Sequence, residues 1–157
     1  MKITLDKTQR DVLHAACLLD LSGVDEIELY VRRGDFSQAR ALAERVVQTA
    51  SLLDRIGWDP HTAEERFDLR GDPVALRRVI ARLRQQAQDS LRDQSAWMSA
   101  DARLPALVGS AEGDINALFR EELQRSVDED LDTRLVCDQI LDELEREREI
   151  VVGCGGP

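Results

Sequence analysis

Apolar residues recur at intervals of three and four along most of the chain, the spacing of one face of an α-helix. The clearest stripe consists of Phe36, Ala39, Leu42, Ala43, Val46, Ala50, Leu53 and Ile56. Asp35 can cap the first turn of this helix, and Gly57 can end the last one. The pattern predicts a helix over 36–56 and places four of its residues at the centre of the domain: Leu42, Val46, Ala50 and Leu53.

The chain before this stripe predicts two more helices. The first can be capped by Asp6 or Thr8 and stops at Ser22-Gly23. Its apolar residues are Val12, Leu13, Ala16, Cys17 and Leu19. Residues 24–33 fit a helix or a strand equally well, and the helical neighbours favour a helix.

Gly-Asp pairs start the helices of the second half. Gly71-Asp72-Pro73 supplies a cap followed by proline at the first helical position, and predicts a helix to about residue 102. Gly113-Asp114 starts another apolar run that reaches Leu144. A helix of about 32 residues would be about 48 Å long, so the prediction allows a bend near 126–130. Pro60 can open a short helix that reaches Glu65.

Two short segments alternate apolar and polar residues instead. Ile3-Thr4-Leu5 and Phe67-Asp68-Leu69 have the period of a strand with one buried face. The matching alternation predicts that they pair into a minimal ladder, which would tie the start of the chain to its middle.

Composition agrees with a helical core. The chain has 157 residues, of which 43% are hydrophobic, 33% charged and 4% aromatic. This mixture is too apolar for a disordered acidic chain, and the core must consist mostly of aliphatic residues. The fold predicted is all-α, a small bundle of four or five amphipathic helices with the possible ladder. Residues 1–150 would form a single domain, and 151–157 a flexible tail.

The charge is strongly acidic and local. The chain has 31 acidic and 21 basic residues, a net charge of −10, and residues 112–149 alone have 14 acidic and 5 basic residues, a net −9. This field repels phosphate backbones, so we expect no nucleic-acid partner. The acidic segment is interpreted as a solvated helix face, with a docking surface for a basic partner as the alternative.

One basic stretch stands against this background and consists of Arg77, Arg78, Arg82 and Arg84. It can bind phosphate or an acidic partner. The favoured interpretation is that it pairs inside the chain with the acidic segment 112–149.

The apolar runs, the lysine content and the cysteine positions indicate where the protein is located and how its cysteines are used. The first residues form no apolar run typical of a signal peptide, and no stretch approaches the ~18 apolar residues of a membrane span. We therefore expect a cytoplasmic protein with no membrane partner. Only Lys2 and Lys7 are lysines, a bias that indicates a high-GC, bacterial genome. Cys17 and Cys137 lie in apolar helical stretches and are expected in the core, and Cys154 in the tail.

Candidate reactive groups are sparse, and each has a structural explanation. Arg33-Gly34-Asp35 and Arg70-Gly71-Asp72 spell an adhesion tripeptide, but helix ends and caps account for both. His61 and Glu65 share a helix face that could hold a metal, and His14 with Cys17 could form a nucleophilic pair. A polar first turn and core packing are favoured respectively, so we assign no catalytic, cofactor-binding or metal-binding residue and expect no cofactor.

The sequence thus favours a non-catalytic helical module for protein–protein interaction or regulation in a bacterial cytoplasm. Its expected partner is a protein or a second copy, bound through the 115–147 helix. The seam predicted for such a dimer consists of Val136, Ile140 and Leu144. The alternative is a small-ligand-binding bundle or an enzyme with a pocket near Trp58, His61 and Trp97. His14 is a further pocket candidate, and a Trp97 that caps the core is the simpler interpretation.

Overall fold

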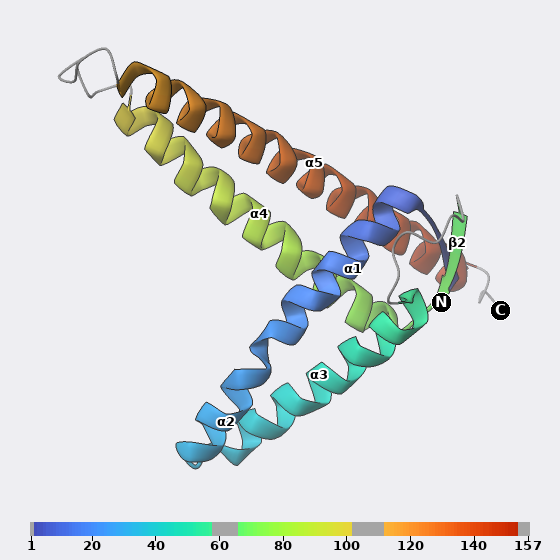
Figure 1. Ribbon diagram of the computed structural model, residues 1–157. Helices are drawn as coiled ribbons and strands as arrows, with labels where there is room; N and C mark the ends of the chain where they lie inside the picture. The colour runs from blue at the N-terminus through green and yellow to red at the C-terminus, as the bar shows by residue number, and fades with distance from the viewer. Residues whose placement is uncertain (1, 58–65, 102–111, 154–157) are drawn as a thin grey trace. The chain divides into compact units, whose positions relative to one another are not determined.

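The structure is a computed structural model that describes residues 2–57, 66–101 and 112–153. The chain divides into two compact units, Met1–Leu83 with Val136–Pro157 and, separately, Arg84–Leu135. The described residues form five α-helices, one short 3₁₀ helix and a two-stranded sheet, which confirms the all-α fold with a minimal ladder (Figure 1). No helix in this part of the chain is long and apolar enough to cross a membrane. The single domain over 1–150 stays a prediction.

The predicted ladder is confirmed. Strands β1 (Lys2–Asp6) and β2 (Arg66–Arg70) pair antiparallel, with Ile3 opposite Leu69 and Leu5 opposite Phe67. Ile3, Leu5 and Leu69 are buried and form one wall of the core. A two-stranded sheet is marginal in water, so this apolar face holds the ladder against the helices.

Helix α1 (Lys7–Leu21) begins with the expected cap. The Asp6 carboxylate accepts from the Gln9 backbone N–H at 2.8 Å, and the Gln9 side chain accepts from the Asp6 N–H at 3.0 Å. This reciprocal pair is a capping box. The 3₁₀ helix η1 (Ser22–Val24) then leads into α2 (Asp25–Arg32), so the helical interpretation of 24–33 is confirmed.

Helix α3 (Phe36–Ile56) packs against α1 and α2. A buried arginine of α1 satisfies its final turn, since Arg10 donates to the Ile56 carbonyl through Nε at 3.2 Å and Nη2 at 2.7 Å. Gly57 follows with a φ of +85°, which favours glycine. Together these contacts fix where α3 ends.

The core-facing side of α3 differs in part from the predicted stripe. Leu42 and Leu53 are buried as predicted, but Val46 is only half-buried and Ala50 is exposed. Thr49 and Leu52 are buried instead. The helix is therefore turned toward a polar residue, and the buried partner of Thr49 described below explains why.

Helix α4 (Pro73–Asp101) begins at the predicted start, where the Asp72 carboxylate accepts from the Val74 N–H at 2.9 Å. Helix α5 (Glu112–Gly153) continues without interruption through 126–130, where the prediction allowed a bend. The described part of the predicted tail, 151–153, belongs to this helix. The short helix predicted between Pro60 and Glu65 lies outside the described residues.

The core of the first unit is mostly aliphatic. It collects buried residues from the ladder and from α1, α3, α4 and α5, and both described cysteines lie in it. The largest fully buried side chains include Leu13, Leu53, Ile80 and Ile140. Burial of this kind is the main favourable term in folding.

Two substitutions on α3 test this packing. Leu53→Ala should lower the free energy of unfolding by about 2–5 kcal/mol, because it leaves a cavity in a fully buried position. Ala50→Ser, three residues earlier, should change it by less than about 0.5 kcal/mol, since Ala50 is exposed. Urea denaturation of both variants checks the pair, and equal losses would contradict the observed orientation of α3.

Candidate functional site

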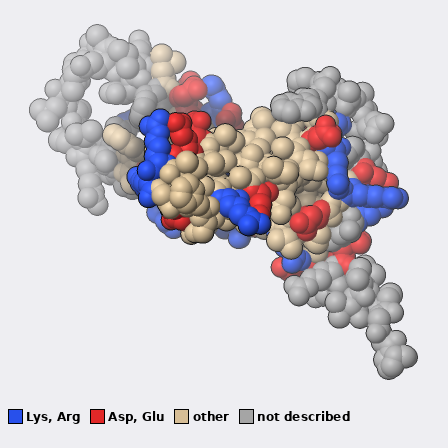
Figure 2. Space-filling view, turned by 90° about the horizontal axis from the view of Figure 1, so that it is seen from below, with Lys and Arg blue, Asp and Glu red and all other residues tan. Residues whose placement is uncertain are grey.

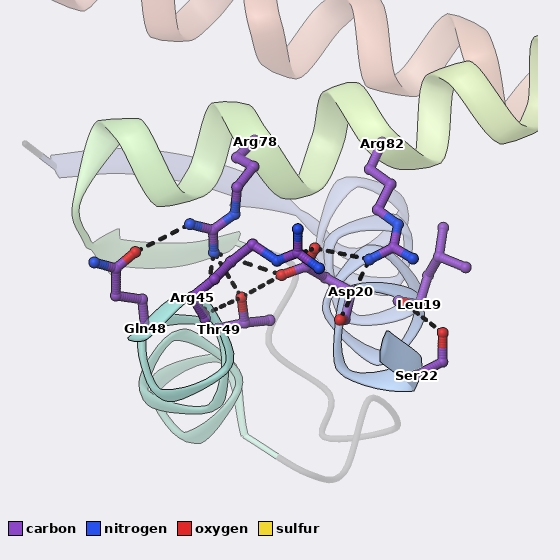
Figure 3. A network of polar contacts seen from close by, with 8 residues as sticks. All are labelled: Leu19, Asp20, Ser22, Arg45, Gln48, Thr49, Arg78 and Arg82. Carbon is purple, nitrogen blue, oxygen red and sulfur yellow. Dashed lines mark hydrogen bonds and ion pairs between the residues drawn. The ribbon is translucent and has the colours of Figure 1, made fainter. Parts of the chain in front are cut away.

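A charged side chain lies inside the first unit. Asp20, near the end of α1, is 1% exposed and is met by side chains from α3 and α4 (Figure 3). Burial of an unpaired carboxylate is costly, so Asp20 must be stabilised by the groups around it.

Four polar side chains supply that stabilisation. The Thr49 hydroxyl donates to Oδ2 of Asp20 at 2.6 Å, and Arg82 Nη1 donates to Oδ1 at 3.1 Å. Arg78 Nη2 lies 3.5 Å from Oδ2, and Arg45 Nε lies 3.7 Å from Oδ1. We call these five residues the Asp20 cluster.

Arg78 extends the cluster beyond the carboxylate. Its Nη2 donates to the Thr49 hydroxyl at 2.8 Å and to the Arg45 carbonyl at 3.3 Å, and its Nη1 donates to Gln48 at 3.0 Å (Figure 3). One guanidinium of α4 thus binds successive turns of α3. Its planar fork of donors suits several acceptors at once.

The surroundings keep Asp20 charged. Burial by itself raises the pKa of this carboxyl, because the charged form loses water. Hydrogen bonds from Thr49 and Arg82, and then the charges of Arg45 and Arg78, outweigh the effect of burial. The pKa of Asp20 therefore lies below its ordinary value.

Two arginines of the basic stretch pair within the chain, as expected, but their partner is not the expected one. Arg78 and Arg82 contact Asp20 of α1 rather than a carboxylate of the acidic segment 112–149. Arg77 does reach that segment, where it donates to a backbone oxygen, the Leu144 carbonyl, at 3.2 Å.

Sequence reasoning missed three residues of the cluster, namely Asp20, Thr49 and Arg45. Asp20 follows Leu13, Ala16 and Cys17 at helical spacing, so it is a carboxylate on the apolar face of α1. That placement could have predicted the cluster, because a charged residue on a buried helix face requires a partner of opposite charge.

Cys17 and Asp35 have structural roles, and several other candidate reactive groups lie outside the described residues. Burial raises the pKa of the Cys17 thiol to about 12, so Cys17 stays protonated and is a core residue rather than a nucleophile. Asp35 caps α3 through the Gln38 N–H at 3.2 Å, which accounts for the first adhesion-like tripeptide. His61, Glu65, Trp58 and Cys154 lie outside the described residues. No metal-binding group of side chains occurs in the described part of the chain.

A second candidate surface lies on the other unit, Arg84–Leu135, where α4 and α5 run side by side as a hairpin (Figure 1). Gln94 of α4 donates to the Ser126 hydroxyl at 2.8 Å and to the Asp130 carboxylate at 2.9 Å. Among the described side chains of this unit, only Ala87 and Gln94 are buried. The hairpin therefore has almost no apolar core of its own.

The hairpin instead exposes large apolar side chains. Their exposed fractions lie between 48% and 67%, and they are Trp97, Leu118, Leu131 and Leu135. Trp97 does not cap a core, and it is the only residue of the alternative Trp58–His61–Trp97 pocket whose side chain is described.

The side chains predicted for a dimer seam pack inside their own chain instead. Ile140 and Leu144 are fully buried in the core of their own chain, and Val136 packs against that core. The apolar residues that α5 leaves exposed lie nearer its start and are Leu118, Leu131 and Leu135. The dimer itself stays a prediction.

The first unit also exposes apolar side chains, on α3. Figure 2 shows the side on which α2 and α3 lie in Figure 1, with an uncharged area bordered by charged groups of both signs. Phe36 and Val47 of α3 are exposed, and a cleft of about 280 Å³ lies beside Val47, Leu52 and Ala75. This volume is slightly below the ~300–1,000 Å³ typical of small-molecule sites.

Comparison with family models, curated proteins and solved structures gives no match to this chain. The geometry of its own residues is therefore the basis for a functional proposal.

Removal of the buried carboxylate tests the Asp20 cluster. Asp20→Asn should lower the free energy of unfolding by about 3 kcal/mol near neutral pH, because it leaves three guanidinium groups without their anion. A carboxyl with a lowered pKa stabilises the fold above its unfolded pKa of about 3.9, and this contribution is lost as the pH falls through the lower folded value. The wild type and the variant should therefore converge in acid.

Asp68→Asn is the matched control, since the Asp68 carboxylate pairs with Lys2 at 2.6 Å but both side chains are exposed. Its effect should be much smaller than that of Asp20→Asn. Denaturation curves across the acid range check both variants, and a loss for Asp20→Asn that does not depend on pH would contradict the assignment.

Proposed function

We propose that this protein is a non-catalytic protein-interaction module of a bacterial cytoplasm, and that its hairpin Arg84–Leu135 packs against the hairpin of a second copy. The observation that carries the proposal is the combination, in one unit, of four exposed large apolar side chains with almost no buried ones. Two helices of this kind have an apolar surface and no third element within their unit to cover it.

A second hairpin supplies what is missing. Two antiparallel helix pairs form a four-helix bundle, whose core lies between the facing surfaces. Leu131 and Leu135 lie one turn apart on α5 and share a face, so they suit the centre of such an interface. A twofold dimer would place both leucines of each copy in one cluster.

The expected dimer is weak and depends on each leucine. Full burial of a leucine side chain contributes about 1.5–3 kcal/mol, and these side chains are already about half buried. Four such side chains, Leu131 and Leu135 of each copy, contribute roughly 3–6 kcal/mol, which is at the lower end of the ~4–15 kcal/mol cost of association. Loss of one leucine per copy should therefore have a large effect.

The net negative charge of the hairpin opposes the dimer and predicts how its association depends on salt. Residues 84–135 have 11 acidic and 6 basic side chains, a net −5 in each copy. Salt screens this repulsion, so association should tighten as the ionic strength rises. A dimer held by ion pairs between copies would show the opposite dependence.

Sedimentation equilibrium in low and high salt tests the proposal. The wild type should show a salt-strengthened dimer, and Leu131→Glu should be monomeric because it places a carboxylate in an apolar interface. Phe36→Glu is the matched control, since Phe36 is an exposed apolar residue of α3 in the other unit, and it should associate like the wild type. A wild-type monomer at about 100 μM in both salts would overturn the proposal, and so would an unchanged dimer for Leu131→Glu.

A further inference from the structure

The Asp20 cluster has more positive charge than it uses. Three guanidinium groups surround one carboxylate within 4 Å, so two positive charges in this partly buried place have no direct counter-ion in the cluster (Figure 3). Asp20 is also the shared partner of all three arginines. An added anion would relieve the mutual repulsion of the guanidinium groups.

Arg45 is the guanidinium with spare donors. In the described part of the chain its side chain donates no hydrogen bond, and its 3.7 Å separation from Asp20 is longer than one. Its Nε is buried without a partner, whereas the side chain as a whole is 33% exposed. A planar donor group held in place by its neighbours but reachable from solvent suits an oxyanion.

Arg82 approaches the same place from another helix. Arg45 Nη2 and Arg82 Nη1 lie 3.4 Å and 3.8 Å from the point where a side chain on Gly23 would begin. Gly23 does not have a positive φ, so backbone conformation does not require glycine there. What the glycine provides is close access of the two guanidinium groups to one spot.

We propose that Arg45 and Arg82, beside Gly23, form a binding site for a phosphate group. Arg45, Arg78 and Arg82 exceed the Asp20 carboxylate by two positive charges, and the Glu26 carboxylate beside the site reduces this excess to one, so the site as a whole attracts an anion. Arginine binds phosphate through two parallel N–H donors, and here donors come from two helices, α3 and α4. This site involves no residue of the hairpin and does not depend on the proposed dimer.

Glu26 sets the strength of the site. Its Oε1 lies 3.9 Å from the same point beside Gly23, and the side chain is exposed. Glu26 has no ion pair in the described part of the chain, so it repels an incoming anion without neutralising either arginine directly. Glu26→Gln should therefore tighten phosphate binding.

Isothermal titration with inorganic phosphate at constant ionic strength tests the site. Arg45→Gln should weaken binding about ten- to a hundredfold, the effect of losing charge-assisted hydrogen bonds. Arg40→Gln is the matched control, since Arg40 lies on the same helix but is exposed and paired with Glu44 at 2.8 Å. It should bind phosphate like the wild type.

A second variant separates binding from folding. Gly23→Asp places a carboxylate beside Arg45 and Arg82, where it meets only the ends of flexible side chains. It should abolish phosphate binding and raise the melting temperature in the absence of phosphate, because it supplies the anion within the chain.

Phenyl phosphate as a second titrant identifies the source of the group. Tighter binding than inorganic phosphate indicates a phosphate ester as ligand, and weaker binding indicates the free ion. No binding of either probe by the wild type would overturn the proposal. Equal affinities of the wild type and Arg45→Gln would also overturn it, because general attraction to positive charge would then explain the signal.

Discussion

The arrangement of α1, α3 and α4 depends on one buried carboxylate. Four side chains from two other helices surround Asp20, namely Thr49 and Arg45 from α3 and Arg78 and Arg82 from α4. Apolar packing is tolerant of small rotations and slips, whereas a buried charge is stable only where its partners meet it. The cluster therefore selects one packing of the three helices from several that the aliphatic core would allow.

Much of the first unit could be predicted from the chain because its signals are local. The alternation of Ile3-Thr4-Leu5 and Phe67-Asp68-Leu69 identified two strands whose pairing was then observed residue by residue. Asp35 and Asp72 were identified as caps because each precedes an apolar stripe. What failed was the choice between adjacent faces of one helix. Alanine and valine on α3 did not indicate whether Ala50 or Thr49 faces inward, because that depends on Asp20, which lies 29 residues away.

The two units differ in how many of their apolar side chains are buried. The first buries apolar residues from four helices around the ladder and adds the polar cluster. The hairpin has a glutamine as one of its two buried residues and exposes Trp97 and three leucines. The sequence alone could not distinguish the buried leucines of α5 from the exposed ones, because Leu131 and Leu144 belong to the same apolar run. Only the tertiary packing shows that Leu144 is buried and Leu131 is exposed. That difference is why the proposed interaction surface includes Leu131 and Leu135 and not Leu144.

The central claim is that Asp20 and its arginines stabilise the fold through one another. A double-mutant cycle of Asp20→Asn and Arg82→Gln measures this directly, since the two side chains lie 3.1 Å apart and each single change removes the same contact. We predict a coupling free energy of about 1–3 kcal/mol from urea denaturation of the four proteins. A coupling below about 0.3 kcal/mol would mean that the two residues act independently, and it would contradict the role given to the Asp20 cluster.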